Sequence, residues 1–229
     1  MGWRSPGRRS VVAPINPIAL TNLRAWFKSD VGTTIATGVS AWADQSGNGN
    51  NLVQATGSLQ PALTSNAING LPALTFDGAD DTMTVAFALV QPATVFFVMR
   101  PITLVGTRTY VDGGAVADTM AVAQAQLTPN RLRMTAGSVL TGATGIAAGS
   151  PGLVTAIFNG ASSSLNSTDD AGITGNAGAG AGAGLTVGSQ FGGTLPVNAQ
   201  IAEVIVMAAV ATAGERAGIR SYIQQRYAF

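Results

Sequence analysis

Three carboxylates form the part of the sequence best suited to holding a metal ion. Asp77, Asp80 and Asp81 occur within the short stretch FDGADD, and carboxylate oxygens are ligands that Ca²⁺ prefers. Asp44, in another polar segment, could add a further oxygen ligand. Asp-Gly is also an ordinary turn signal, and Asp side chains accept hydrogen bonds from backbone amides in turns. The turn interpretation is preferred, so no cofactor is expected, with calcium as the alternative.

A second polar segment, WADQSGNGNN at residues 42–51, has the composition of a sugar-binding loop. Trp42 could stack on a sugar ring, while Asp44, Gln45 and Asn48 could bond to its hydroxyl groups. A tryptophan on a strand more often fills a sandwich core, however, and SGNGN suits a sharp turn because Gly and Asn tolerate positive φ. We therefore interpret the segment as a turn, with glycan binding as the alternative.

Residues for acid–base catalysis are scarce. The sequence contains no Cys and no His, which excludes a thiol nucleophile, a Cys-based zinc site and the usual general base at neutral pH. It contains two Glu, of which Glu215 fits a helix cap and Glu203 stands alone in IAEVIVM. We expect Glu203 to be a structural carboxylate bonded to backbone or arginine, with its pKa raised by burial. The chain is accordingly predicted not to be an enzyme.

The elements that position these residues are predicted to be mainly β-strands. Short runs with a period of two, separated by Gly, Asn, Asp and Pro, dominate from about residue 20 onward. The predicted strands lie in LRAWFKSD, ALTFDGADDTMTVA, ATVFFVMR, RLRMTAG, LVTAIFNG and QIAEVIVMAA. The run NAGAGAGAG at 176–184 is interpreted as a mobile loop leading into the strand LTVG, because no side chain in it can anchor the chain.

One α-helix is predicted, over residues 213–226. Thr212 and Glu215 form a capping-box pattern at its start. The apolar residues Ile219 and Ile223 follow at helical spacing, on one face of the predicted helix. We expect this helix to dock on the β-sandwich.

Composition excludes several classes of protein. Charged residues make up 10% and hydrophobic residues 46% of the 229 residues, which is typical of a compact domain and not of a disordered chain. The net charge of +1 gives no field that would attract nucleic acid or an anionic membrane surface. We therefore expect neither nucleic acid nor membrane as a partner.

The first 17 residues are predicted to form a basic arm outside the domain at 18–229. Arg4, Arg8 and Arg9 precede the first acid of the chain, Asp30. Prolines interrupt the apolar stretch VVAPINPIAL, so it does not fit a secretion signal. We expect synthesis in a cytoplasm, and we expect the three arginines to dock on carboxylates of a partner.

Several segments resemble the concanavalin A-like lectin/glucanase superfamily, in particular the laminin-G-like jelly-roll modules of bacterial and phage proteins. They are WADQSGNGNNLVQ, QPAL, NGLPALTFDGADD and IAEVIVMAAVATAGERAGIRSYIQQRYAF. The resemblance implies an all-β fold, a two-sheet antiparallel jelly-roll sandwich with a short C-terminal α-helix. The glucanase relatives carry alternating Glu, Asp and Glu on one strand, and that motif is missing here.

The function predicted from these observations is that of a non-enzymatic structural protein of a phage virion, a capsid decoration or tail-associated protein attached through its N-terminal arm. Its expected location is the virion. Its expected partners are other virion proteins and further copies of itself. The alternative is a carbohydrate-binding module for cell-surface or receptor recognition, with glycans as partners.

Overall fold

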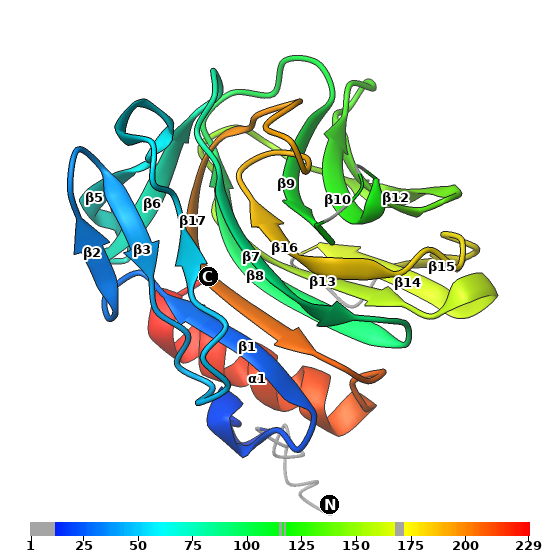
Figure 1. The fold of residues 1–229 in the computed structure, drawn as a ribbon. Coiled ribbons are helices and arrows are strands. Elements are labelled where there is room, and N and C mark those ends of the chain that lie inside the picture. Colours follow the sequence, from blue (N-terminus) through cyan, green and yellow to red (C-terminus); the bar gives the residue numbers. More distant parts are fainter. Residues whose placement is uncertain (1–11, 115, 117, 168–171) are drawn as a thin grey trace, which may run out of the picture.

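Two antiparallel β-sheets lie face to face in the computed structural model, which describes residues 12–114, 116, 118–167 and 172–229 (Figure 1). The strands of sheet A are β1 (Leu23–Lys28), β5 (Ala62–Ile68), β6 (Leu71–Asp77), β8 (Ala93–Pro101), β13 (Gly152–Phe158), β14 (Ser163–Ser167), β15 (Ile173–Gly175) and β17 (Asn198–Met207). Their order is β15-β14-β13-β8-β17-β6-β5, and β1 also pairs with β17.

Sheet B runs β12-β11-β10-β9-β16-β7-β4-β3-β2 across the described residues. Its strands are β2 (Thr33–Ile35), β3 (Val39–Trp42), β4 (Leu52–Val53), β7 (Met83–Leu89), β9 (Arg108–Asp112), β10 (Thr119–Ala125), β11 (Arg131–Ala136), β12 (Val139–Gly145) and β16 (Gly182–Val187). Short 3₁₀ turns occur at Pro17–Ala19, Gly57–Leu59 and Gly160–Ser162. The predicted all-β sandwich is confirmed.

Two apolar cores explain the strand patterns. The larger core lies between the sheets, and the smaller lies between sheet A and the C-terminal helix. Strand β8 contributes to both, since Phe97 belongs to the first core and Phe96 to the second. Its apolar run at 95–99 is therefore that of a central strand covered on both faces.

Helix α1 (Ala213–Tyr227) covers the outer face of sheet A. The predicted capping box is present: the Thr212 side chain accepts from the backbone of Glu215, and the Glu215 side chain accepts from the backbone of Thr212. Ile219 and Ile223 are buried in the smaller core. No helix in the described part of the chain is long and apolar enough to cross a bilayer.

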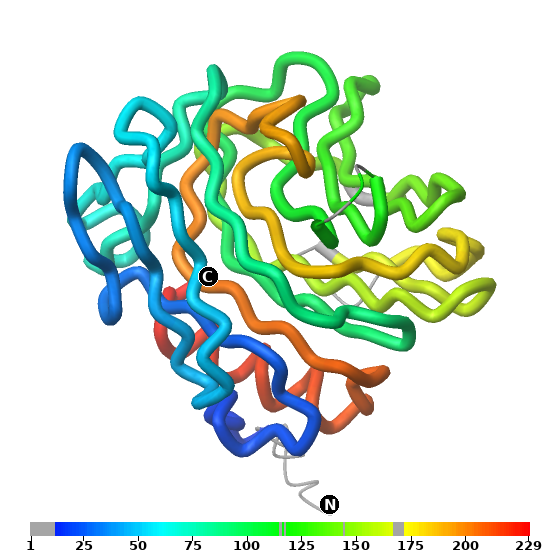
Figure 2. Tube along the Cα trace, viewed as in Figure 1, coloured from blue at the N-terminus to red at the C-terminus, as the bar shows by residue number. Residues whose placement is uncertain are grey.

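The segment just before β1 lies against this helix (Figure 2). The backbone N–H of Ile15 donates to the carbonyl of Gly218 at 3.0 Å, and Pro17 is buried. A Cβ on Gly218 would overlap the Ile15 side chain. Residues 15–17, predicted as part of a free arm, are thus packed on the domain. Arg4, Arg8 and Arg9 lie outside the described residues.

The glycine–alanine run is anchored, contrary to the prediction of a mobile loop. Strand β16 already begins at Gly182, and the Gln91 side chain donates to the carbonyls of Gly178 and Gly180. A Cβ on Gly182 would overlap the Gly113 carbonyl, and one on Gly184 would overlap the Val85 carbonyl. Backbone contact therefore holds this segment, which is an anchor that a search for side chains does not detect.

Candidate functional site

The segment 42–51 folds as a turn. The Trp42 side chain is fully buried, with 0% exposure, and packs against Phe27 in the larger core. The Asp44 carboxylate accepts hydrogen bonds from the backbone N–H groups of Trp26, Ser46 and Asn50. The Trp42 ring consequently has no free face for a sugar.

The remaining polar side chains of this segment bond to main chain. Asn48 donates to the carbonyls of Leu23 and Arg24, and Asn50 also donates to Arg24. Gln45 donates to the carbonyl of Ala43. Of the groups proposed for glycan binding, Asp44 and Asn48 therefore fasten the loop to β1, and Gln45 bonds within the loop.

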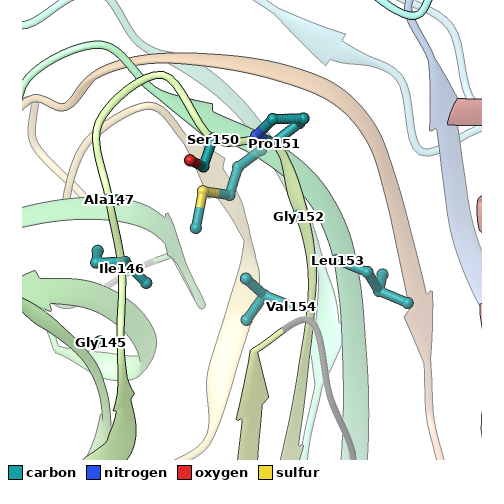
Figure 3. A pocket seen from close by; sticks show the side chains of 9 residues that line it. Gly145, Ile146, Ala147, Ser150, Pro151, Gly152, Leu153 and Val154 are labelled. Atoms are coloured by element: carbon teal, nitrogen blue, oxygen red, sulfur yellow. The ribbon is translucent and has the colours of Figure 1, made fainter. Parts of the chain in front are cut away.

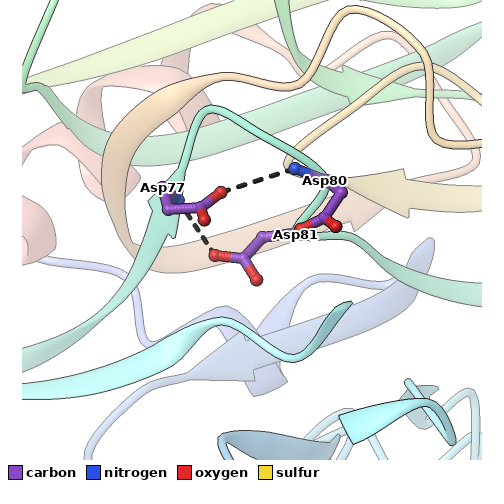
Figure 4. Close-up of side chains that lie close together, drawn as sticks. All are labelled: Asp77, Asp80 and Asp81. Atoms are coloured by element: carbon purple, nitrogen blue, oxygen red, sulfur yellow. Dashed lines mark hydrogen bonds between the residues drawn. The ribbon is translucent and has the colours of Figure 1, made fainter. Parts of the chain in front are cut away.

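The acidic turn brings its three carboxylates together at the end of β6 (Figure 4). One carboxylate oxygen from each of Asp77, Asp80 and Asp81 lies within 4.8 Å of the others. The turn also uses these groups internally: the Asp77 side chain accepts from Ala79 and Asp80, and Asp81 accepts from the backbone of Asp77. The arrangement has the oxygen chemistry of a calcium site and equally the hydrogen bonds of a turn.

Burial separates Asp81 from its two exposed neighbours. Desolvation raises the pKa of the Asp81 carboxyl, and the charges of Asp77 and Asp80 raise it further, while the hydrogen bond from the backbone of Asp77 lowers it. Calcium binding stays the alternative prediction for this turn.

Glu203 is enclosed beneath α1, on the outer face of sheet A. Its carboxylate accepts from the indole Nε1 of Trp26 at 2.7 Å and from the hydroxyls of Tyr222 at 3.0 Å and Tyr227 at 2.9 Å. Arg226 completes the set, with its Nε 3.3 Å from the carboxylate, and also pairs with Asp30. Burial raises the pKa of Glu203, and these partners oppose that rise. Glu203 is therefore a structural carboxylate.

The outer face of sheet B carries a row of polar residues that the sequence did not reveal. Thr186 of β16 is paired with Thr84 of β7 on one side and with Asp112 of β9 on the other. Residues directly opposite each other in neighbouring strands share a face of the sheet. The adjacent pair Val187 and Val111 belongs to the larger core, so Asp112, Thr186 and Thr84 point outward.

Asp112 holds two loops over this face. One carboxylate oxygen accepts from the backbone N–H of Gly113, and the other accepts from those of Asp118 and Phe191. The side chain is fully buried, and desolvation raises the pKa of this carboxyl while the three backbone hydrogen bonds lower it. Asp118 in turn accepts from the side chain of Gln190. Gly113 and Asp118 are thereby joined to the loop at 188–194 above the sheet.

Phe191 projects from the second loop with 40% of its surface exposed. Two adjoining hollows of about 330 and 410 Å³ share Phe191 and Thr84 in their walls. We call the pair the Phe191 hollow. Its lining residues are Leu59, Asp80, Thr82, Thr84, Val85, Ala86, Gly114, Ala183, Thr186, Phe191, Gly192 and Gly193.

One hydroxyl of this lining lacks a partner. Thr186 has 0% exposure, and its Oγ1 makes no hydrogen bond with the described residues. Buried polar groups are nearly always satisfied, by protein, water or ligand. An aromatic ring, hydroxyls and the Asp80 carboxylate therefore surround a space of ligand size.

The sequence held a weak signal for this site. Gly-Ser-Gln-Phe-Gly-Gly at 188–193 is a loop that carries an aromatic residue between glycines. Strands β7 and β9 are far from this loop in the sequence, so the sequence does not show that the three contact one another.

A separate small cavity of about 160 Å³ lies at the start of β13 (Figure 3). It is lined by Met99, Gly145, Ile146, Ala147, Ser150, Pro151, Gly152, Leu153 and Val154. Ser150 is the one polar side chain in that lining, so the cavity offers little chemistry.

Comparison with known proteins identifies the fold. No protein-family model and no curated protein matches the chain. A sialidase from Trypanosoma rangeli in complex with the inhibitor DANA matches with a TM-score of 0.61 at 13% identity, over 95% of this chain and 36% of that one. This chain thus spans about a third of the sialidase.

Two further solved structures match over different shares of their length. Domain 4 of AbnA, a GH43 extracellular arabinanase from Geobacillus stearothermophilus in complex with arabinotriose, matches with a TM-score of 0.59 at 14% identity, over 87% of this chain and 98% of that one. A GH54 arabinofuranosidase soaked with a 4-nitrophenyl arabinofuranoside matches with a TM-score of 0.57 at 12% identity, over 82% of this chain and 51% of that one. At such low identity, these TM-scores show a shared fold alone.

The prediction that the chain is not an enzyme needs correction. It was drawn from the absence of Cys and His and from the lone Glu203, yet the three solved structures described above come from glycoside hydrolases. The likeness is one of fold, so it transfers no catalytic residue to this chain.

Proposed function

We propose that the protein binds a saccharide in the Phe191 hollow. The observation that carries the proposal is the exposed Phe191 side chain, which lines two hollows and whose backbone N–H is held by the buried Asp112 carboxylate. An aromatic ring offers an apolar face to the C–H groups of a sugar, and nearby hydroxyls and carboxylates bond to its hydroxyl groups. Thr84 and Asp80 supply such groups here.

Size and likeness support the same proposal. Each hollow falls in the range of about 300–1,000 Å³ that small-molecule sites occupy. Domain 4 of AbnA, nearly all of which the match covers, was solved in complex with arabinotriose. The laminin-G-like assignment and the virion role stay proposals, and a saccharide site would suit receptor recognition in that setting.

The test is to measure, by NMR and by calorimetry, the affinity of the protein for four trisaccharides: arabinotriose, xylotriose, cellotriose and galactotriose. We expect one or more to bind, Phe191→Ala to weaken binding at least tenfold, and Phe191→Tyr to retain it. Val139→Ala is the control, because Val139 is also exposed, at 57%, and lies on the same sheet. Loss of binding in the control, or none lost in Phe191→Ala, would place the site elsewhere. Reducing ends are assayed in parallel to detect hydrolysis.

A further inference from the structure

We infer that the Phe191 hollow selects uncharged saccharides against acidic ones, and that Asp80 sets this selectivity. The inference rests on the proposed saccharide binding and concerns the class of ligand. It follows from the charges around the hollow and from the kind of hydrogen-bonding group in its lining.

Among the described residues, the lining contains no basic side chain. Its one charged side chain is Asp80, and the carboxylates of Asp77 and Asp81 lie within 4.8 Å of that of Asp80. Recognition of a carboxylate or sulfate in proteins relies on charge-assisted donors, chiefly Arg and Lys. An acidic sugar would meet a negative rim and find no such donor.

The support beneath the hollow is also acidic. Asp112 is paired with Thr186, which belongs to the lining, and Asp118 bonds through Gln190 to the loop that carries Phe191. The hydrogen bonds of Asp112 come from backbone N–H groups, which carry no net charge. No described arginine or lysine forms an ion pair with either carboxylate.

Basic residues on the same outer face are separated from the hollow. Arg131 and Arg133 alternate with the core residues Leu132 and Met134 along β11, so they point outward. Strands β9 and β10 lie between β11 and β16. Three strand spacings amount to about 14 Å, which exceeds the screening length of about 8 Å at physiological salt.

Neutral hydroxyl groups fit the lining better. Thr84, which is partly exposed, has a hydroxyl that both donates and accepts. Asp80 can accept from sugar hydroxyls. This set satisfies a polyol without a charge on the ligand.

The experiment compares galactotriose with trigalacturonate, which differ in a CH₂OH or a carboxylate on each ring. Affinity is measured by NMR titration in buffer with chelator, so that no divalent cation neutralises the rim. We expect trigalacturonate to bind at least tenfold more weakly than galactotriose. The ratio of the two dissociation constants, called the gap below, should fall about threefold in Asp80→Asn, and it should also fall in the wild type at 0.5 M salt. Asp30→Asn is the matched control, since it removes the same charge beside α1, and it should leave the gap unchanged.

The outcomes separate the two proposals. If neutral and acidic ligands bind equally well, or the acidic one binds better, the charge selectivity is overturned while saccharide binding stands. If Asp30→Asn narrows the gap as much as Asp80→Asn, the net charge of the protein and not Asp80 sets the preference. If galactotriose does not bind, the pair is repeated with whichever neutral ligand of the panel binds and its uronate counterpart. Binding of no member refutes the saccharide site itself.

Discussion

The two outer faces of the sandwich are organised around two buried carboxylates with opposite consequences. Glu203 on sheet A receives hydrogen bonds from side chains, and two of its partners, Tyr222 and Tyr227, lie on α1. Asp112 on sheet B receives hydrogen bonds from the backbone of two loops. The first carboxylate closes its face under a helix, whereas the second keeps a hollow open beside Phe191.

This difference shows how one sandwich can devote one sheet to stability and the other to binding. Side-chain donors bring apolar surface with them, so the helix that bonds Glu203 also buries Ile219 and Ile223. Backbone donors bring only the loop itself, which leaves side chains such as Phe191 free to face solvent.

Glu203→Ala should give the largest effect and would break the closed face. The change leaves the Trp26 indole and two tyrosine hydroxyls without their acceptor, removes one of the two carboxylates that pair with Arg226, and opens a cavity. We expect a loss of about 3–5 kcal/mol in the free energy of unfolding, measured by urea denaturation. Tyr222→Phe, which removes one of these bonds, should cost about 1 kcal/mol. Equal losses in the two variants would show that Glu203 is not the centre of the cluster.

Asp112→Asn should cost less stability but should disturb the open face. The single amide oxygen of Asn cannot replace both carboxylate oxygens, so we expect a loss of about 2 kcal/mol. The loop that carries Phe191 would loosen, and saccharide affinity should fall at least tenfold at a temperature where the variant is folded. The Glu203 variants, compared under folding conditions, should keep wild-type affinity. If Asp112→Asn binds as the wild type does, the hollow does not depend on this carboxylate.

Stability should fall as the pH rises above the ordinary pKa values of carboxyl groups, 3.8 for Asp and 4.5 for Glu. Burial raises the pKa of Asp81, Asp112 and Glu203 above these values. Between the ordinary and the raised pKa the folded state binds more protons than the unfolded state, so the free energy of unfolding decreases with pH. We expect the decrease to be smaller in Asp112→Asn. A rise in the free energy of unfolding over this range would contradict the prediction.

The smallest effect is expected at the acidic turn on the rim of the open face. Without cations, Asp80→Asn should stabilise the protein by roughly 0.3 kcal/mol because it removes repulsion from Asp77 and Asp81. If calcium binds there, the wild type should gain thermal stability on adding Ca²⁺ and the variant should not. Identical melting temperatures of the wild type with Ca²⁺ and with chelator would favour the turn interpretation.

Local patterns in the sequence, together with the family resemblance, were sufficient for the fold class and for part of the closed face. The capping box at Thr212 is a short-range signal and correctly indicated the helix. The burial of Glu203 and its pairing with arginine were also expected, whereas its partners Trp26, Tyr222 and Tyr227 were not. The turn at 42–51 was likewise predicted from the sequence, because its Gly and Asn residues determine the local backbone conformation.

The open face could not be predicted in the same way. The hollow depends on β7, β9, β16 and the loop at 188–194, which meet only through the order of strands in sheet B. The polar residues of this site are common ones, since Thr and Asp also occur in turns and on solvated strands. Their value comes from pairing across strands, which a single sequence does not display.

The glycine–alanine run also has a consequence for how the chain tolerates change. At Gly178, Gly182 and Gly184, any side chain would occupy space already filled by a neighbouring carbonyl. The glycines of the most repetitive stretch are therefore expected to be among the least replaceable residues of the chain. In a library of random variants, the members that fold should retain these glycines, although the composition of this stretch is the simplest in the chain.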